Sequence, residues 1–151
     1  MFISWLLTIN SYAQDNPSCL LEHCKEKETT QELSVLQKPL QACSSSPLTG
    51  FFRDSYCRTG PSDVGFHVVC AEVNEAFLQY TQSMGNDLST PNLRYNFPGL
   101  KPGDRWCLCA TRWKQAKEAG FPTTVILPAT NIKALRTLDK KELNIRTTPP
   151  Q

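Results

Sequence analysis

Seven cysteines in a chain of 151 residues make thiol chemistry the most distinctive signal of this sequence. Thiolates bind zinc and iron, act as nucleophiles, and join into disulfides. Because the total is odd, at least one thiol has no partner within the chain. Five of the cysteines and one of the two histidines lie in the central part of the chain: Cys43, Cys57, Cys70, Cys107, Cys109 and His67. Three interpretations follow, and the sequence leaves all three open.

The first interpretation, and the leading one, is a transition-metal site. Closed structural sites for zinc or iron use four thiolate or imidazole ligands, and the central residues supply enough of them. The predicted ligands are Cys57, Cys70, Cys107, Cys109 and His67. No Cys-x-x-Cys pair is present among these ligands, so the prediction rests on ligand type rather than spacing. On a helix, Cys107 and Cys109 would diverge by about 200°, whereas an extended segment would point both to one side.

The second interpretation is a thiol-dependent enzyme in which Cys107 is the nucleophile. If Asp104 caps a helix, Cys107 occupies its third position, where unpaired backbone N–H groups and the helix dipole stabilise a thiolate. His67 would act as the base if the fold brings the two together. Six polar residues are predicted to line a small pocket beside them: Arg53, Arg58, Asp63, Asn86, Asp87 and Arg105.

The third interpretation is a structural or partner-binding module without chemistry of its own. Cysteine is among the most buried residue types and packs as a small hydrophobic side chain. In an oxidising compartment some of these thiols would join into disulfides, and the pairing cannot be read from the sequence.

The N-terminal residues predict the compartment. An apolar run over residues 2–9 is too short to span a bilayer, and Ser11 and Ala13 are the small residues that precede a signal-peptidase cut. We therefore expect a signal peptide at 1–13, although no basic residue precedes Lys25. A polar linker with Cys19 and Cys24 fills 14–37. The protein is periplasmic or secreted if this signal operates, and cytoplasmic otherwise.

Composition narrows the class of protein. Hydrophobic residues make up 40% of the chain, which excludes disorder by composition, and the length fits one domain, expected at 38–143 with a tail at 144–151. Sixteen basic and fourteen acidic residues give a net charge of +2. This balance is too even to indicate a nucleic acid or an anionic membrane as a partner.

The expected elements are short and irregularly ordered. Strands are predicted at 66–73 and 122–127, and a helix capped by Asn74 ends at Gly85. A long loop covers 86–103. A helix at 104–119 is preferred to a strand at 105–110, and short helical segments follow at 130–135 and 139–143. The pattern predicts an α+β fold that is loop-rich and cysteine-rich, with helices packed on a small mixed sheet.

Four stretches carry a resemblance to a known family. They read PLTGFFRD at 47–54, CRTGP at 57–61, GNDLSTP at 85–91 and FPGLKPGDRWCLC at 97–109. They resemble the bacterial family catalogued as domain of unknown function 2237, over roughly residues 38–143. The resemblance implies a domain boundary and no activity. The extension before residue 38 departs from the form that we expect of most members, which we take to be cytosolic.

Overall fold

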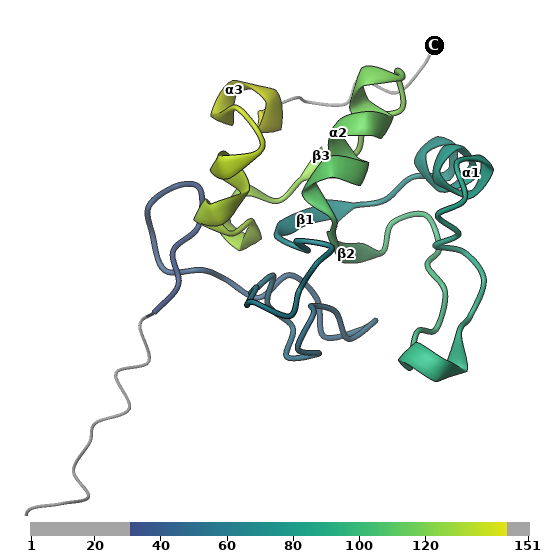
Figure 1. Cartoon of the computed structure of the whole chain (residues 1–151), viewed down its shortest axis with the longest axis horizontal. Coiled ribbons are helices and arrows are strands. Elements are labelled where there is room, and N and C mark those ends of the chain that lie inside the picture. The colour runs from purple at the N-terminus through teal and green to yellow at the C-terminus, as the bar shows by residue number, and fades with distance from the viewer. Residues whose placement is uncertain (1–30, 145–151) are drawn as a thin grey trace, which may run out of the picture. The chain divides into compact units, whose positions relative to one another are not determined.

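The structure is a computed structural model that describes residues 31–144 (Figure 1). The predicted signal at 1–13, both cysteines of the linker and most of the tail lie outside these residues. Among the described helices, none combines the length and the apolar character that a bilayer crossing requires.

A three-stranded antiparallel sheet organises the described chain. Strand β1 (Val69–Glu72) lies in the middle, between β2 (Arg105–Leu108) and β3 (Thr124–Val125). Both pairings are antiparallel, where a mixed sheet was expected. The α-helices are α1 (Glu75–Ser83), α2 (Ala110–Glu118) and α3 (Lys140–Leu143), and the 3-10 helices are η1 (Leu93–Tyr95), η2 (Leu127–Ala129) and η3 (Ile132–Arg136). The predicted α+β class is confirmed.

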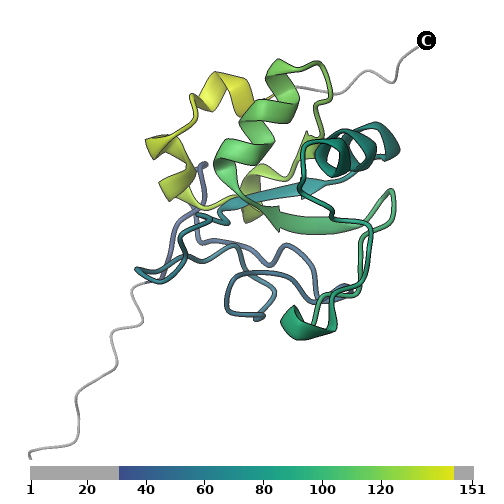
Figure 2. The ribbon, with the colours of Figure 1, turned by 45° about the vertical axis from the view of Figure 1, so that its right-hand side comes forward.

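The two faces of the sheet bury different kinds of side chain. Because successive residues of a strand point to opposite faces, Ala71 of β1 and Trp106 of β2 join the larger hydrophobic core, whereas Cys70 and Cys107 join a smaller, cysteine-rich one. Figures 1 and 2 show the three α-helices on one side of the sheet and the irregular segment 31–66 on the other. The cysteines therefore lie between the sheet and the loops.

Helix α1 follows its sequence signals closely. The Asn74 side chain accepts a hydrogen bond from the backbone N–H of Phe77 at 2.8 Å, as predicted for the cap. Phe77 is buried in the larger core, and the helix is followed by Gly85. Local capping and spacing were sufficient here.

The helix predicted at 104–119 is wrong in its first part. Residues Arg105–Leu108 form β2, and α2 begins only at Ala110. The Asp104 side chain accepts a hydrogen bond from the backbone N–H of Lys101 instead of capping a helix. In the strand that pairs with β1, Trp106 and Cys107 are buried on opposite faces of the sheet. The free energy gained by this burial outweighs the local preference for a helix.

Candidate functional site: a cysteine cluster and a neighbouring pocket

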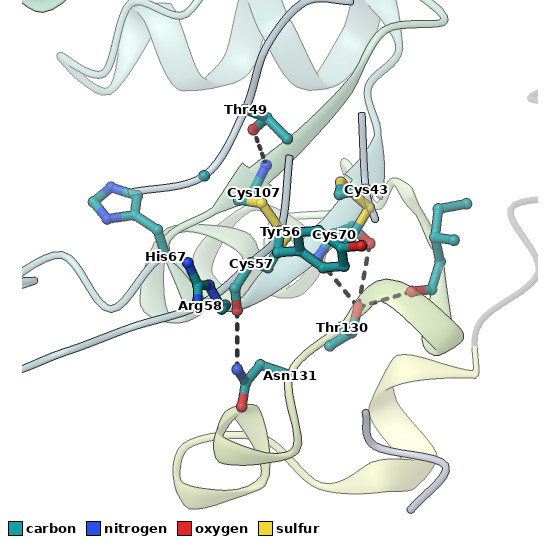
Figure 3. Close-up of a disulfide and its surroundings, with 12 residues drawn as sticks. Cys43, Thr49, Tyr56, Cys57, Arg58, His67, Cys70, Cys107, Thr130 and Asn131 are labelled. Atoms are coloured by element: carbon teal, nitrogen blue, oxygen red, sulfur yellow. Dashed lines mark hydrogen bonds between the residues drawn. A yellow bond between two sulfur atoms is a disulfide. The ribbon is translucent and has the colours of Figure 1, made fainter. Parts of the chain in front are cut away.

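Four buried cysteines meet between the sheet and segment 31–66. Cys43 is joined to Cys70, and Cys57 to Cys107, by two disulfides (Figure 3). The sulfur atoms of Cys43, Cys57 and Cys70 all lie within 4.8 Å of one another. We call these four residues the cysteine cluster. None of the four residues is more than 4% exposed.

The sheet places two of the four sulfurs side by side. Cys70 and Cys107 are directly opposite each other in the β1–β2 pair. The Cys107 N–H points away from β1 and donates to Thr49 Oγ1 at 2.9 Å, and the Cys70 N–H donates to Thr130 Oγ1 at 3.1 Å. The two residues therefore form a non-hydrogen-bonded pair, the closer of the two antiparallel arrangements. Their side chains are neighbours on one face.

Loop contacts bring the other two cysteines to this face. The Cys43 N–H donates to the carbonyl of Ser55 at 2.7 Å, which holds two turns of segment 31–66 together. The carbonyl of Cys57 accepts a hydrogen bond from Asn131 Nδ2 at 3.0 Å. Figure 3 shows Thr49, Thr130 and Asn131 bound to the backbone around the sulfurs. The cluster is thus held by backbone hydrogen bonds as well as by its disulfides.

Three of the five predicted metal ligands meet in the cluster, and two do not. Cys57, Cys70 and Cys107 are together, with Cys43 as the fourth member, which the sequence reasoning did not select. Cys109 occupies the N-cap position of α2, is partly exposed and is the free cysteine of the described residues. Figure 3 shows the ring of His67 directed away from the disulfides.

The predicted nucleophile does not lie where the hypothesis required. Cys107 belongs to strand β2, forms a disulfide with Cys57, and is not at a helix N-terminus. The residue at the start of α2 is Cys109, whose sulfur contacts the hydroxyl of Thr111 at 3.1 Å. Because residues 105–108 form a strand, the helix begins after Cys109, and Cys107, two positions earlier in the chain, lies in the strand.

His67 is held in one orientation by a buried carboxylate. Its Nδ1 and the Asp63 Oδ1 are 2.6 Å apart, and its backbone N–H donates to Asp63 Oδ2 at 2.9 Å. Burial raises the pKa of Asp63, but these bonds and one from the Thr59 hydroxyl outweigh burial and hold that pKa below its usual value. With Nδ1 engaged by the carboxylate, Nε2 is the ring nitrogen left for other partners.

A cavity of about 910 Å³ lies beside the cluster, at the free edge of β2. Two loops and this strand supply its walls: Gly50, Phe51, Arg53, His67, Gly85, Asn86, Asp87, Leu88, Thr90, Pro91, Asn92, Tyr95, Phe97, Trp106 and Cys107. We call it the pocket. Its volume falls in the range of small-molecule sites.

The pocket takes in some of the polar residues named from the sequence and leaves others out. Arg53, Asn86 and Asp87 line it, and Asp63 supports it through His67. Arg58 instead forms an ion pair with Asp54. The Nε atom of Arg105 lies 3.5 Å from Oε2 of Glu72, on the neighbouring strand of the sheet. The aromatic walls, Phe51, Tyr95, Phe97 and Trp106, were not predicted, because only the fold brings these four together.

Asp87 shapes the loop that forms one wall. Its Oδ1 accepts the backbone N–H groups of Ser89 at 2.8 Å and Thr90 at 3.0 Å. Hydrogen bonds from Thr90 and Ser89 lower the pKa of Asp87 to about 2. The carboxylate is therefore ionised at neutral pH, and its hydrogen bonds hold the turn at residues 87–90.

Comparison with known proteins identifies one family. The sequence model of the family described as "Uncharacterized protein conserved in bacteria (DUF2237)" matches residues 33–146, slightly more than the predicted span of 38–143. No curated protein matches the chain.

Proposed function

Since the chain belongs to this bacterial family of uncharacterised proteins, we propose a function from the geometry of its cysteine cluster: a transition-metal site that forms when the four cysteines are reduced. The observation that carries the proposal is that three buried sulfur atoms lie within 4.8 Å of one another and the fourth, that of Cys107, is bonded to one of them. Zinc and iron are the metals that sulfur-only sites prefer. A structural module held by disulfides alone is the alternative.

The spacing of the sulfurs supports a tetrahedral site. A Zn–S bond is about 2.3 Å, so the ligands of a tetrahedral zinc lie about 3.8 Å apart. Three sulfurs are already within 4.8 Å of one another, and the fourth, that of Cys107, is bonded to one of them. Breaking the disulfides lets each bonded pair separate toward this distance by side-chain rotation, with no change in the sheet.

The surroundings support a fixed ligand set. Cys70 and Cys107 are carried by paired strands, and sites built on strands are held more precisely than sites built on loops. Threonine hydroxyls accept the backbone N–H groups of both residues, and Asn131 holds the carbonyl of Cys57. Such outer contacts orient metal ligands in known sites.

The exchange between the two forms balances as follows. Each disulfide takes two electrons and two protons from a dithiol, which is itself oxidised to a disulfide. The four thiols then release their protons to solvent as the metal binds, since thiolate is the ligand. Metal binding and disulfide formation thus compete for the same four sulfur atoms.

Export of the protein to an oxidising compartment would favour the disulfide-bonded form. The two disulfides point to an oxidising compartment, and we propose, with the apolar run at 2–9, that the protein is periplasmic or secreted. The metal form would then precede oxidation, or replace the disulfides where a dithiol reductant is present.

The test measures metal and thiols on the same sample. The untagged full chain is refolded anaerobically with reductant and zinc, and a second portion is refolded oxidised without reductant. After gel filtration, elemental analysis is expected to find about one zinc per chain in the reduced portion and none in the oxidised one. Iron in place of zinc, when both are supplied, also supports the proposal.

Matched variants assign the site. Cys43→Ser and Cys70→Ser are expected to lose the zinc, whereas Cys109→Ser is expected to keep it. Because Cys19 and Cys24 also offer thiolates, the double Ser variant of that pair is a second control, and it too should keep the metal. A folded, reduced chain without metal, or metal lost from either control and kept by Cys70→Ser, would overturn the proposal.

A further inference from the structure

The pocket lies outside the proposed metal chemistry and has a character of its own. We propose that it binds a small organic carboxylate with a flat, apolar body. The proposal uses none of the sulfur chemistry, although Cys107 also lines the pocket, because it rests on the aromatic and charged side chains of the two loops and of the outer edge of β2.

The walls of the pocket suit a flat apolar group. Phe97 and Trp106 pack edge to face with ring centroids 5.2 Å apart, and Phe51 and Tyr95 stand at the exposed rim. Phe51 and Tyr95 are 36% and 64% exposed, a cost in water that a bound apolar body would relieve. Aromatic walls with a few fixed polar groups are typical of small-molecule sites.

Arg53 supplies an unneutralised positive charge. None of the ion pairs within residues 31–144 involves it. Its Nη1 donates to the carbonyl of Gly50 at 2.7 Å, its Nη2 to that of Tyr95 at 3.2 Å, and its guanidinium carbon lies 5.0 Å from the centre of the Trp106 ring. These contacts hold the guanidinium at the wall, over the Trp106 ring. Carboxylate and phosphate are the groups that a guanidinium recognises, and of the two a carboxylate is planar like the aromatic body proposed for the ligand.

The same arginine has an unused donor. Its Nε is buried and has no hydrogen-bond partner among the described residues. A buried donor without a partner costs about 1–3 kcal/mol; because this nitrogen is buried, a ligand oxygen reaches it only if the Arg53 side chain turns toward the pocket, and the new hydrogen bond would then recover that cost. Residue 53 also has a positive φ of 53°, which shows that the surrounding turn holds it in place.

The remaining polar groups are consistent with an anion. Asp87 carries the opposite charge, but its oxygens accept hydrogen bonds from Ser89, Thr90 and Gln82. His67, held by Asp63, keeps Nε2 as a hydrogen-bonding group at the wall. Arg53 is therefore the charged side chain of the pocket whose sign suits an anion, and the Asp87 carboxylate is held in its loop by these hydrogen bonds.

The test compares two probes of the same shape and opposite charge. 2-Naphthoate and 2-naphthylmethylamine are titrated into the oxidised, isotope-labelled full chain, and binding is followed through the indole N–H of Trp106 and the Nε–H of Arg53. The carboxylate is expected to shift both signals and to bind about tenfold more tightly than the amine. Equal affinities, or no shift of either signal by millimolar naphthoate, would overturn the proposal.

Two variants test the role of Arg53. Arg53→Gln is expected to weaken naphthoate binding about tenfold, while Arg112→Gln, on the exposed face of α2, leaves it unchanged. Unchanged naphthoate affinity in a folded Arg53→Gln would refute the assignment. Since Arg53 also joins two loops, this variant is checked for folding first. The comparison of the two probes needs no substitution, so it decides the charge preference in any case.

Discussion

Cys70 and Cys107 face each other directly across β1 and β2, yet each forms its disulfide with a loop cysteine and not with the other. Two adjacent positions of the sheet thus hold two separate points of segment 31–66. This arrangement gathers four sulfurs without using any sequence spacing that a metal motif would show. The same arrangement makes the loops depend on the sheet for their position.

Removing the longer disulfide is expected to destabilise the oxidised chain strongly. The Cys57–Cys107 bond closes a loop of 50 residues, and the chain-entropy relation gives about 4 kcal/mol for that length. The Cys57→Ser and Cys107→Ser double variant should lower the free energy of unfolding by about this amount in denaturant titrations. Cys109→Ser is the control and should change it by less than about 0.5 kcal/mol. An unchanged midpoint in the double variant would show that the bridge adds nothing.

Thr130→Val should be costly although the two side chains have nearly the same shape. Thr130 Oγ1 accepts the Cys70 N–H at 3.1 Å and is fully buried, so the variant leaves a buried donor without a partner. A loss of about 1–3 kcal/mol in the free energy of unfolding is expected. The exposed Thr111→Val, on α2, provides the comparison. Similar effects of both variants would contradict this reading of the hydrogen bond.

Two glycines with similar backbone angles should respond differently to alanine. Gly50 and Gly103 have φ values of +97° and +94°, so both substitutions carry the cost of a left-handed residue, about 1–2 kcal/mol. At Gly50 an added Cβ would also overlap the carbonyl oxygen of Tyr56, while at Gly103 nothing lies within 4 Å. Gly50→Ala should therefore have the lower thermal midpoint of the two. Equal midpoints would argue against the close approach at the pocket wall.

Asp87→Asn should remove part of the acid sensitivity of the protein. The folded pKa of Asp87 is about 2, below its usual value of 3.8. The ionised form is therefore favoured by folding, and its contribution is complete above pH 4 and lost as the pH falls toward 2. The difference in free energy of unfolding between wild type and variant should be largest at neutral pH and shrink over this window. A difference that is constant from pH 7 to pH 2 would contradict the assigned shift.

The sequence predicted elements where the deciding signals were local. Asn74 and the apolar spacing after it define α1 correctly, because a cap and a helix face are properties of neighbouring residues. The segment at 105–108 was wrongly expected to be helical, because its partner strand lies more than 30 residues away in the chain. Local preference cannot report such a pairing.

The candidate site was likewise predictable where residue type was enough and not where distant segments had to meet. Residue type identified Cys57, Cys70 and Cys107, and the fold added Cys43, whose partner is 27 residues away. No spacing rule connects these four positions. The aromatic walls of the pocket were missed for the same reason, since Trp106 reaches the pocket only because its strand is at the edge of the sheet.

Burial of the cysteine cluster separates its redox state from the solution around it. The four residues are between 0% and 4% exposed beneath segment 31–66, which has no helix or regular strand. Because these residues are so little exposed, we expect a reductant to reach the sulfurs mainly in molecules whose loops have opened locally, so the rate of reduction should follow the population of that open state. Disulfides formed in the compartment where the protein folds would therefore persist for some time after transfer to a reducing one. Conditions that loosen the loops, rather than a change of reducing potential alone, would allow their reduction.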